Sequence, residues 1–267
     1  MKRFSTLILL LAIFLTGCSS ASSTPIIDSA NQPPRTLTVF AAASLTDAFT
    51  EIGNNFQAAN PNVTVTFNFA GSQALRTQIE EGAPADVFAS ASGKEMEALV
   101  TGSFVTAESS QIFLNNKLVV ILPTANSAGI DSIEDLATAG IKIVLAAEEV
   151  PVGRYSREAL DKMNGVYGSD FKDKVLANVV SNEDNVKQVV AKVQLGEADA
   201  GIVYTSDAVA APELVTIEIP TDINVVAKYP IAPLVESANA ELAQAFIAYV
   251  LSDEGQAILQ KWGFASP

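Results

Sequence analysis

Two serines stand at points where a short apolar segment gives way to a helical pattern. Ser44 follows the apolar residues 39–43, and Ser72 follows residues 67–71. The first N–H groups of a helix have no partner within the helix, and the helix dipole attracts negative charge to that end. A serine hydroxyl adds a further hydrogen-bond donor there. Two such turns predict a site that binds an anion.

Three further positions share this setting. Val152 and Val186 stand at the starts of two predicted helices, where each offers only its backbone N–H, and Tyr204 ends the apolar segment 201–204. In an open α/β sheet, ligands bind beyond the carboxyl ends of the strands, and all five positions fall at such ends. This common placement, rather than any single residue, favours a binding site.

Each of these residues also has a purely structural interpretation. Ser44, with Asp47 three residues later, fits a helix capping box. Ser72 after Gly71 fits a plain helix N-cap. The two valine side chains would simply pack in the core, and Tyr204 would be a core aromatic residue with a solvated hydroxyl.

The composition narrows the classes of function. Acidic residues outnumber basic ones by 30 to 16, the formal net charge is −14, and histidine is absent. Nucleic acid is excluded as a partner, because phosphate backbones need clustered Lys and Arg. A hydrolase with Ser44 or Ser72 as nucleophile is the alternative from a different class, but it would lack histidine, the commonest activating base. We expect a binding protein with no catalytic residue and no cofactor.

Charged residues near the five positions are expected to stay outside the site. Three acidic pairs could hold a metal ion, but solvated faces explain them better. They stand at residues 80–81, 148–149 and 183–184. Glu148 and Asp184 would repel an anion, so we expect them to point away from it. Arg154 could attract an anion from a distance, but an exposed helix residue is the simpler interpretation.

The first residues of the chain have the pattern of a targeting signal. Lys2 and Arg3 precede an apolar run at residues 7–15, which is too short to span a membrane and is typical of a secretory signal. Residues 1–17 are therefore expected to be a signal peptide. The segment 18–35 is rich in Ser and Pro and predicts a flexible tether. The globular part is expected to lie outside the cytoplasmic membrane.

Cys18 is the single cysteine of the chain and cannot form an internal disulfide. It follows the small residues Thr16 and Gly17, directly after the apolar run. This arrangement resembles the bacterial lipobox, and the resemblance implies that Cys18 becomes the lipidated first residue of the mature protein. The alternative is an ordinary cleaved signal that happens to contain a cysteine.

Strand and helix patterns alternate along the rest of the chain, which predicts an α/β fold with mostly parallel sheets flanked by helices. Short apolar or alternating runs predict the strands, and apolar residues at helical spacing predict the helices. The predicted strands are residues 36–43, 63–69, 86–89, 117–122, 141–145, 175–180, 201–204 and 225–235. The later predicted helices are residues 153–163, 186–193, 240–251 and 253–261.

Two α/β units with only two evident connecting strands predict two lobes joined by a two-strand hinge. Residues 117–122 would cross outward and residues 225–235 would return. The first lobe would then contain residues 36–120 and 230–267, and the second lobe residues 121–229.

The globular part resembles the bacterial molybdate-binding proteins of ABC transporters over nearly its whole length. The motifs that carry the resemblance are residues 40–49, 69–75, 81–88, 150–153, 183–187, 196–204 and 229–231. The resemblance implies a two-lobed, type II periplasmic-binding-protein fold that closes around a tetrahedral oxyanion. It also implies the groups that hold the anion. They are the hydroxyls of Ser44, Ser72 and Tyr204 and the backbone amides of Val152 and Val186.

The same resemblance implies a function. The protein would be the monomeric, extracytoplasmic component of an ABC importer that captures molybdate or tungstate and delivers it to the permease. A protein for sulfate or another tetrahedral oxyanion on the same fold is the alternative. Val152 departs from the alanine common in the family, which affects pocket size or closure, and Asn185 leaves open which amide faces the ligand. A site of donors alone would disfavour monohydrogen phosphate, whose proton needs an acceptor.

Overall fold

The structure is a computed structural model that describes residues 33–267. The predicted signal peptide, the lipidation site Cys18 and the tether up to residue 32 lie outside the described residues. Within residues 33–267, no helix combines the length and the apolar character that crossing a membrane requires.

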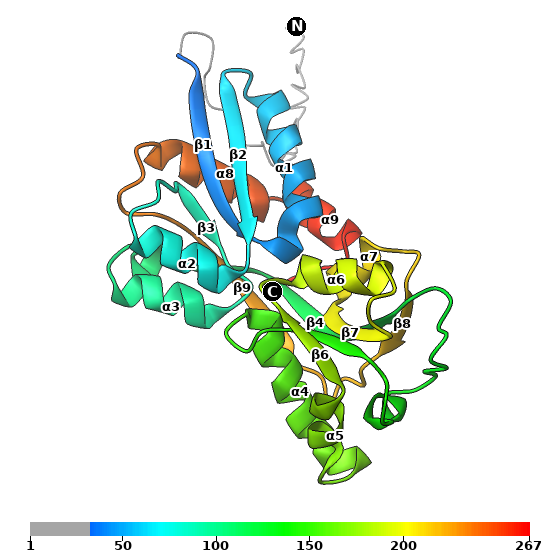
Figure 1. The fold of residues 1–267 in the computed structure, drawn as a ribbon. Helices are drawn as coiled ribbons and strands as arrows, with labels where there is room; N and C mark the ends of the chain where they lie inside the picture. Colours follow the sequence, from blue (N-terminus) through cyan, green and yellow to red (C-terminus); the bar gives the residue numbers. More distant parts are fainter. Residues whose placement is uncertain (1–32) are drawn as a thin grey trace, which may run out of the picture.

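One sheet runs through the described part of the chain, in the strand order β2-β1-β3-β9-β4-β7-β5-β6 (Figure 1). In the first lobe, β1 (Arg35–Ala42) pairs in parallel with β2 (Val63–Ala70) and β3 (Val87–Ala89). In the second lobe, β5 (Ile143–Ala146) pairs in parallel with β6 (Val179–Glu183) and β7 (Ala200–Tyr204). The predicted α/β class with mostly parallel lobes is confirmed.

Helices cover both faces of the sheet in the first lobe (Figure 1). On one face, apolar residues of β1 pack with α1 (Thr46–Ala59), α8 (Ala240–Leu251) and α9 (Asp253–Lys261). On the other face, Phe40 packs with α2 (Ser72–Glu80) and α3 (Gly93–Thr101). The side chains of a strand alternate between the faces, so one strand serves both layers.

The described residues of the second lobe include four α-helices, three of which directly follow a strand, while α5 follows α4. They are α4 (Pro151–Tyr167), α5 (Phe171–Ala177), α6 (Val186–Gln194) and α7 (Thr205–Val209). The short strand β8 (Val215–Glu218) pairs with β4 at its side.

Two strands cross between the lobes, β4 (Gln111–Leu122) and β9 (Val226–Pro233). The first part of β4 pairs antiparallel with β9, and the last pair in this ladder is Lys117 with Val226. From Leu118 onward, β4 pairs instead with β7, where Leu118 stands opposite Tyr204. Asn224 stabilises this exchange, because its side chain bonds both the N–H and the carbonyl of Leu118, at 3.1 and 2.9 Å.

The strand predicted at residues 175–180 exists, but the prediction starts it four residues too early. Helix α5 occupies residues up to Ala177, because Phe171 and Val175 are spaced for one buried helical face, and β6 begins only at Val179. Strand β8 was not predicted, although Val215 and Ile217 alternate with Thr216 and Glu218; the strand is short and most of its residues are exposed. The predicted hinge strand 117–122 is also longer and begins at Gln111.

Candidate functional site

All five predicted site residues line one small cavity between the lobes. Ser44 and Ser72 come from the first lobe, and Val152, Val186 and Tyr204 come from the second. The other lining residues are Ala42, Ala43, Ala70, Gly71, Ala91, Val150, Pro151 and Asn185. The cavity volume is about 10 Å³, close to the room that one water molecule needs. The closed lobes therefore leave little free space between the five residues.

The Ser72 hydroxyl keeps its proton free for a ligand. Ser72 is the first residue of α2, and the N-cap is Gly71, so Ser72 does not cap the helix. Its Oγ instead accepts a hydrogen bond of 3.0 Å from the backbone N–H of Ala91. The protein therefore uses the oxygen of this hydroxyl, and its O–H can donate into the cavity.

Ser44 is likewise not a helix cap. It lies inside the short 3-10 helix Ala43–Leu45, and its Oγ is 2.9 Å from the hydroxyl of Tyr229. Asp47, the expected partner in a capping box, bonds Lys187 of the second lobe. The capping interpretation is wrong for both serines, because tertiary partners take the hydroxyls that a cap would use.

Two backbone amides reach the cavity from helix starts of the second lobe. Helix α4 begins at Pro151, which has no N–H, so Val152 supplies the first free amide. Helix α6 begins at Val186, and the Asn185 side chain caps it by accepting from the N–H of Gln188 at 3.2 Å. Val186 is thus the first helical residue, and its amide is one of those left without an intrahelical partner.

Gly153 lets α4 begin close to the end of β5. A Cβ at this position would lie 2.5 Å from the carbonyl oxygen of Ala146, and closer still to that of Ala147. We expect Gly153→Ala to lower the free energy of unfolding by about 2 kcal/mol, because the helix start must shift. Gly165→Ala, in the same helix with nothing within 4 Å, should instead raise it by up to about 1 kcal/mol. Urea denaturation measures both, and equal effects would contradict the close approach.

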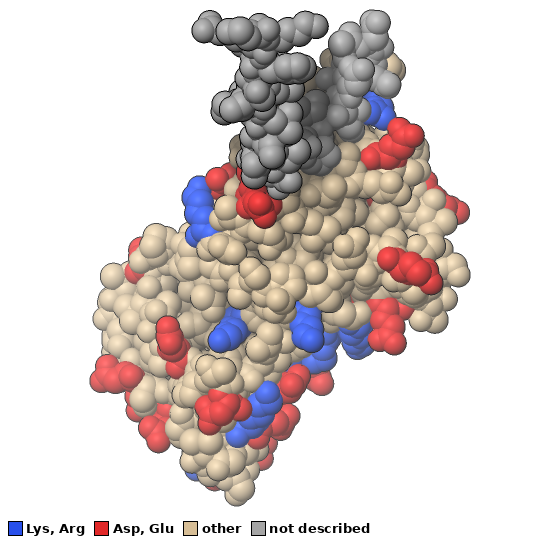
Figure 2. Space-filling view, turned by 180° about the vertical axis from the view of Figure 1, so that it is seen from behind, with Lys and Arg blue, Asp and Glu red and all other residues tan. Residues whose placement is uncertain are grey.

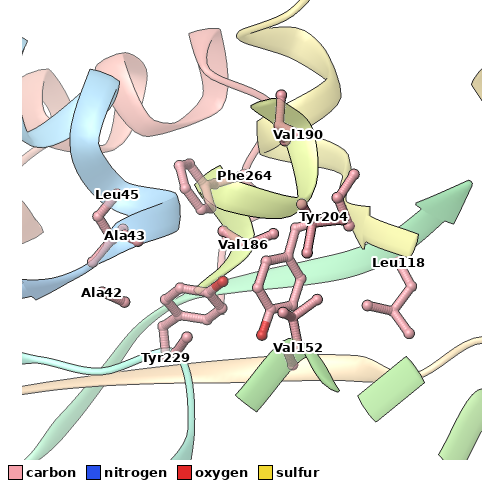
Figure 3. Close-up of a cluster of buried hydrophobic side chains, with 14 of the residues drawn as sticks. Ala42, Ala43, Leu45, Leu118, Val152, Val186, Val190, Tyr204, Tyr229 and Phe264 are labelled. Atoms are coloured by element: carbon pink, nitrogen blue, oxygen red, sulfur yellow. The ribbon is translucent and has the colours of Figure 1, made fainter. Parts of the chain in front are cut away.

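Tyr204 places an unpaired hydroxyl at the cavity. Its ring is buried, and its hydroxyl oxygen has no hydrogen-bond partner within the described residues. Burial raises the pKa of Tyr204 well above its ordinary value, so the group remains a donor at neutral pH. Figure 3 shows Tyr204 beside Tyr229, with Val152 and Val186 nearby. A buried hydroxyl without a partner is costly, and a ligand in the cavity would satisfy it.

None of the described residues that line the cavity is Lys or Arg. Glu148 and Asp184 are exposed and do not line it, as expected. No cluster of three or more potential metal ligands occurs in residues 33–267. On the face shown in Figure 2, several Lys and Arg lie across the middle of the molecule, and Asp and Glu stand close to them. The lining is mostly apolar, and its polar groups are hydroxyls, backbone groups and the Asn185 side chain rather than cations.

Polar side chains bridge the two lobes beside the cavity, and the sequence did not indicate them. Lys187 of α6 bonds Asp47 of α1 at 2.7 Å and lies 3.5 Å from the buried Asp207 of α7. Burial alone would lower the pKa of Lys187, but the carboxylates of Asp207 and Asp47 outweigh it and raise the pKa. The residues involved are far apart in the chain, and opposite charges alone are too common to predict the pairing.

Arg154 forms a second bridge, so its interpretation as an exposed helix residue is wrong. Its guanidinium donates to the Ser92 hydroxyl at 2.6 Å and lies 3.8 Å from Glu95, both in the first lobe. The Gln73 amide forms a third contact by donating to the backbone carbonyl of Asp184 at 3.2 Å. The two lobes are therefore closed on each other in this structure.

Comparison with known proteins places this architecture in a family. Bacterial extracellular solute-binding proteins match residues 37–265. The molybdate-binding protein ModA of Mycobacterium tuberculosis is 38% identical over 254 residues, which cover 95% of this chain and 93% of that protein. A Bacillus subtilis protein named as the ABC transporter substrate-binding lipoprotein YvgL is 32% identical over 269 residues and covers 99% of both chains.

A solved structure of a related protein also matches this chain. That structure is described as the substrate-binding domain of a molybdenum ABC transporter from Clostridium difficile. Its sequence is 33% identical to this chain, and the two structures match with a TM-score of 0.66. The match covers 87% of this chain and 99% of that chain. By these matches and by its two-lobed fold, the chain belongs to the bacterial extracellular solute-binding protein family.

Proposed function

We propose that this protein captures a tetrahedral oxyanion, molybdate or tungstate, between its lobes and delivers it to the permease of an ABC importer. The observation that carries the proposal is the convergence of donors on one small cavity. Three hydroxyls and two helix-start amides from both lobes line it, and the Tyr204 hydroxyl has no hydrogen-bond partner among residues 33–267. The names of the relatives support molybdate as the ligand.

The donors are sufficient in number to replace the water around a dianion. A hydrogen bond to a charged group contributes about 1.5–3 kcal/mol, so several converging bonds offset dehydration without a salt bridge. The free helix ends add favourable dipoles. Closure of the lobes buries the anion and creates the surface that the permease would recognise.

The kind of donor also selects among anions. Ser72 and Tyr204 present protons to the cavity, and a fully deprotonated oxyanion can accept from all of them. Monohydrogen phosphate carries a proton that would face another donor, which costs binding energy. Sulfate is fully deprotonated as well, so size alone separates it from molybdate. Sulfate is therefore the second candidate ligand.

Further properties belong to the same proposal. The binding role requires no catalytic residue and no cofactor, and the protein would act as a monomer. A lipid on Cys18 would hold it at the outer face of the membrane. Mass spectrometry of the protein isolated from its native membrane tests the anchor, because lipidation at Cys18 adds the mass of the acyl chains after residues 1–17 are removed.

Ser72→Ala tests the site directly. We expect it to weaken molybdate binding about tenfold, because one charge-assisted hydrogen bond is lost. Ser169→Ala, at an exposed position of the second lobe, is the matched control and should leave affinity unchanged. Calorimetry of the purified protein with molybdate, tungstate and sulfate measures both the loss and the preference. Unchanged affinity in Ser72→Ala would show that the anion binds elsewhere.

A further inference from the structure

Tyr229 lies directly behind Ser44 and does not line the cavity itself. It belongs to β9, its side chain is fully buried, and its hydroxyl is 2.9 Å from the Ser44 Oγ. Its ring meets the Tyr204 ring edge-on, with the centroids 5.8 Å apart (Figure 3). Tyr229 can therefore influence a ligand only through Ser44 and Tyr204.

The direction of the hydrogen bond between Tyr229 and Ser44 follows from the ligand. In general, either hydroxyl could donate. A fully deprotonated oxyanion only accepts, so the Ser44 proton points to the anion when the site is filled. Tyr229 must then donate to the Ser44 oxygen. Burial raises the pKa of Tyr229 far above neutral pH, so Tyr229 always carries this proton. A phenol donates more readily and accepts less readily than an aliphatic hydroxyl, so donation from Tyr229 to Ser44 is also the direction that the pair favours by itself.

The two serines share this arrangement. Behind Ser72, the donor is the backbone N–H of Ala91 at 3.0 Å. Behind Ser44, the donor is the hydroxyl of Tyr229. In each case, a protein donor occupies a lone pair of the serine oxygen and turns the serine proton toward the cavity. Only proline at position 91 would remove the backbone donor, and it would also constrain the chain there, whereas Tyr229→Phe removes the hydroxyl donor with little change of shape.

We propose that Tyr229 is a positioning residue that holds Ser44 as a hydrogen-bond donor and thereby favours fully deprotonated oxyanions over protonated ones. The inference rests on the proposed function of the same site. Without the Tyr229 hydroxyl, the Ser44 side chain is free to turn a lone pair toward the cavity. It could then accept the proton of an anion such as monohydrogen arsenate, which is tetrahedral like molybdate.

Tyr229→Phe in the full chain tests this role by calorimetry at pH 8. We expect molybdate binding to weaken about tenfold, and the ratio of molybdate to arsenate affinity to fall at least fivefold, with arsenate measured by competition against molybdate. Tyr249→Phe is the matched control, because it removes a buried tyrosine hydroxyl that bonds Glu254 of α9, outside the cavity-lining set. It should leave both affinities unchanged.

A double-mutant cycle with Ser44→Ala separates positioning from a merely structural effect. If Tyr229 acts through Ser44, Tyr229→Phe should change molybdate affinity less than twofold in the Ser44→Ala background. An unchanged molybdate affinity in the single variant, or the same tenfold loss in both backgrounds, would overturn the inference. Wild-type protein that binds neither molybdate, tungstate nor sulfate would instead overturn the proposed function.

Discussion

Gly71→Ala is expected to weaken oxyanion binding about 100-fold while both lobes remain folded. Gly71 lies in the first lobe, and a Cβ there would stand 2.6 Å from the backbone carbonyl oxygen of Asp184 in the second lobe. The Gln73 side chain, also close, could move aside, but a backbone carbonyl can retreat only if the lobes part. The φ angle of −59° suits alanine, so the first lobe itself is not strained.

The size of the effect follows from the way the lobes share the ligand. Ser44 and Ser72 are on one side of the cavity, and the amides of Val152 and Val186 are on the other. Lobes held apart would lengthen the bonds from one side, and the loss of one or two charge-assisted bonds amounts to about 2.7 kcal/mol, or 100-fold.

Gly93→Ala is the control for this experiment. Gly93 begins α3 in the same lobe and has nothing within 4 Å of an added Cβ. Calorimetry should give wild-type affinity for Gly93→Ala and the large loss for Gly71→Ala, while both ligand-free proteins unfold at temperatures close to that of the wild type. Wild-type affinity in Gly71→Ala would mean that the anion does not require the closed arrangement.

Lys187→Met is expected to lower the free energy of unfolding by about 3 kcal/mol at pH 8. Lys187 is the ion-pair partner of Asp207, whose side chain is fully buried. Removing the lysine leaves a buried carboxylate without a counter-charge, which is among the costlier single changes. The exposed Lys174, paired with Asp170 on the surface of α5, offers the control Lys174→Met, with an expected change below about 0.5 kcal/mol.

The loss of stability in Lys187→Met should depend on pH in a defined direction. Burial raises the pKa of Asp207 from 3.8 to about 6, although Lys187 lowers it. The folded state therefore holds this proton more tightly than the unfolded state, and the resulting stability is lost as the pH rises through about 6. Without Lys187 the pKa of Asp207 is higher still. The decrease in the free energy of unfolding of Lys187→Met should accordingly be small at pH 5, where Asp207 is mostly neutral, and large at pH 8.

A second substitution identifies the buried charge as the cause. Asp207→Asn in the Lys187→Met background should recover most of the lost stability at pH 8, because the unpaired carboxylate is gone. Urea denaturation at pH 5, 6.5 and 8 measures the series. If the loss of stability is equal at all three pH values, or remains after Asp207→Asn, Lys187 stabilises the fold by packing alone.

The sequence was most informative where function depends on local chain geometry. A helix that follows a strand leaves free N–H groups at its start whatever the rest of the chain does. Ser44, Ser72, Val152 and Val186 could therefore be recognised as donors from their neighbours in sequence. The structure brings them, with Tyr204, to one cavity. The α/β class followed in the same way, from apolar runs at spacings of two and of three to four residues.

Local reasoning failed where a distant partner decided the outcome. A capping box was predicted at Ser44, but its hydroxyl bonds a residue 185 positions away and Asp47 bonds one 140 positions away. Arg154 reaches across 62 positions to Ser92, against the expectation of an exposed residue. Residues 175–177 were predicted as part of a strand because they begin the short apolar run 175–180, but the buried face shared with Phe171 makes them helical.

By itself, the sequence determined the kinds of group that can meet an anion and the chain positions at which they are free. These follow from backbone geometry within a few residues. Only the tertiary structure decided which way each hydroxyl points, which charges bridge the lobes and where a single added methyl would prevent closure. These properties depend on contacts between segments that are remote in the chain, and packing of the two lobes, not local propensity, sets such contacts.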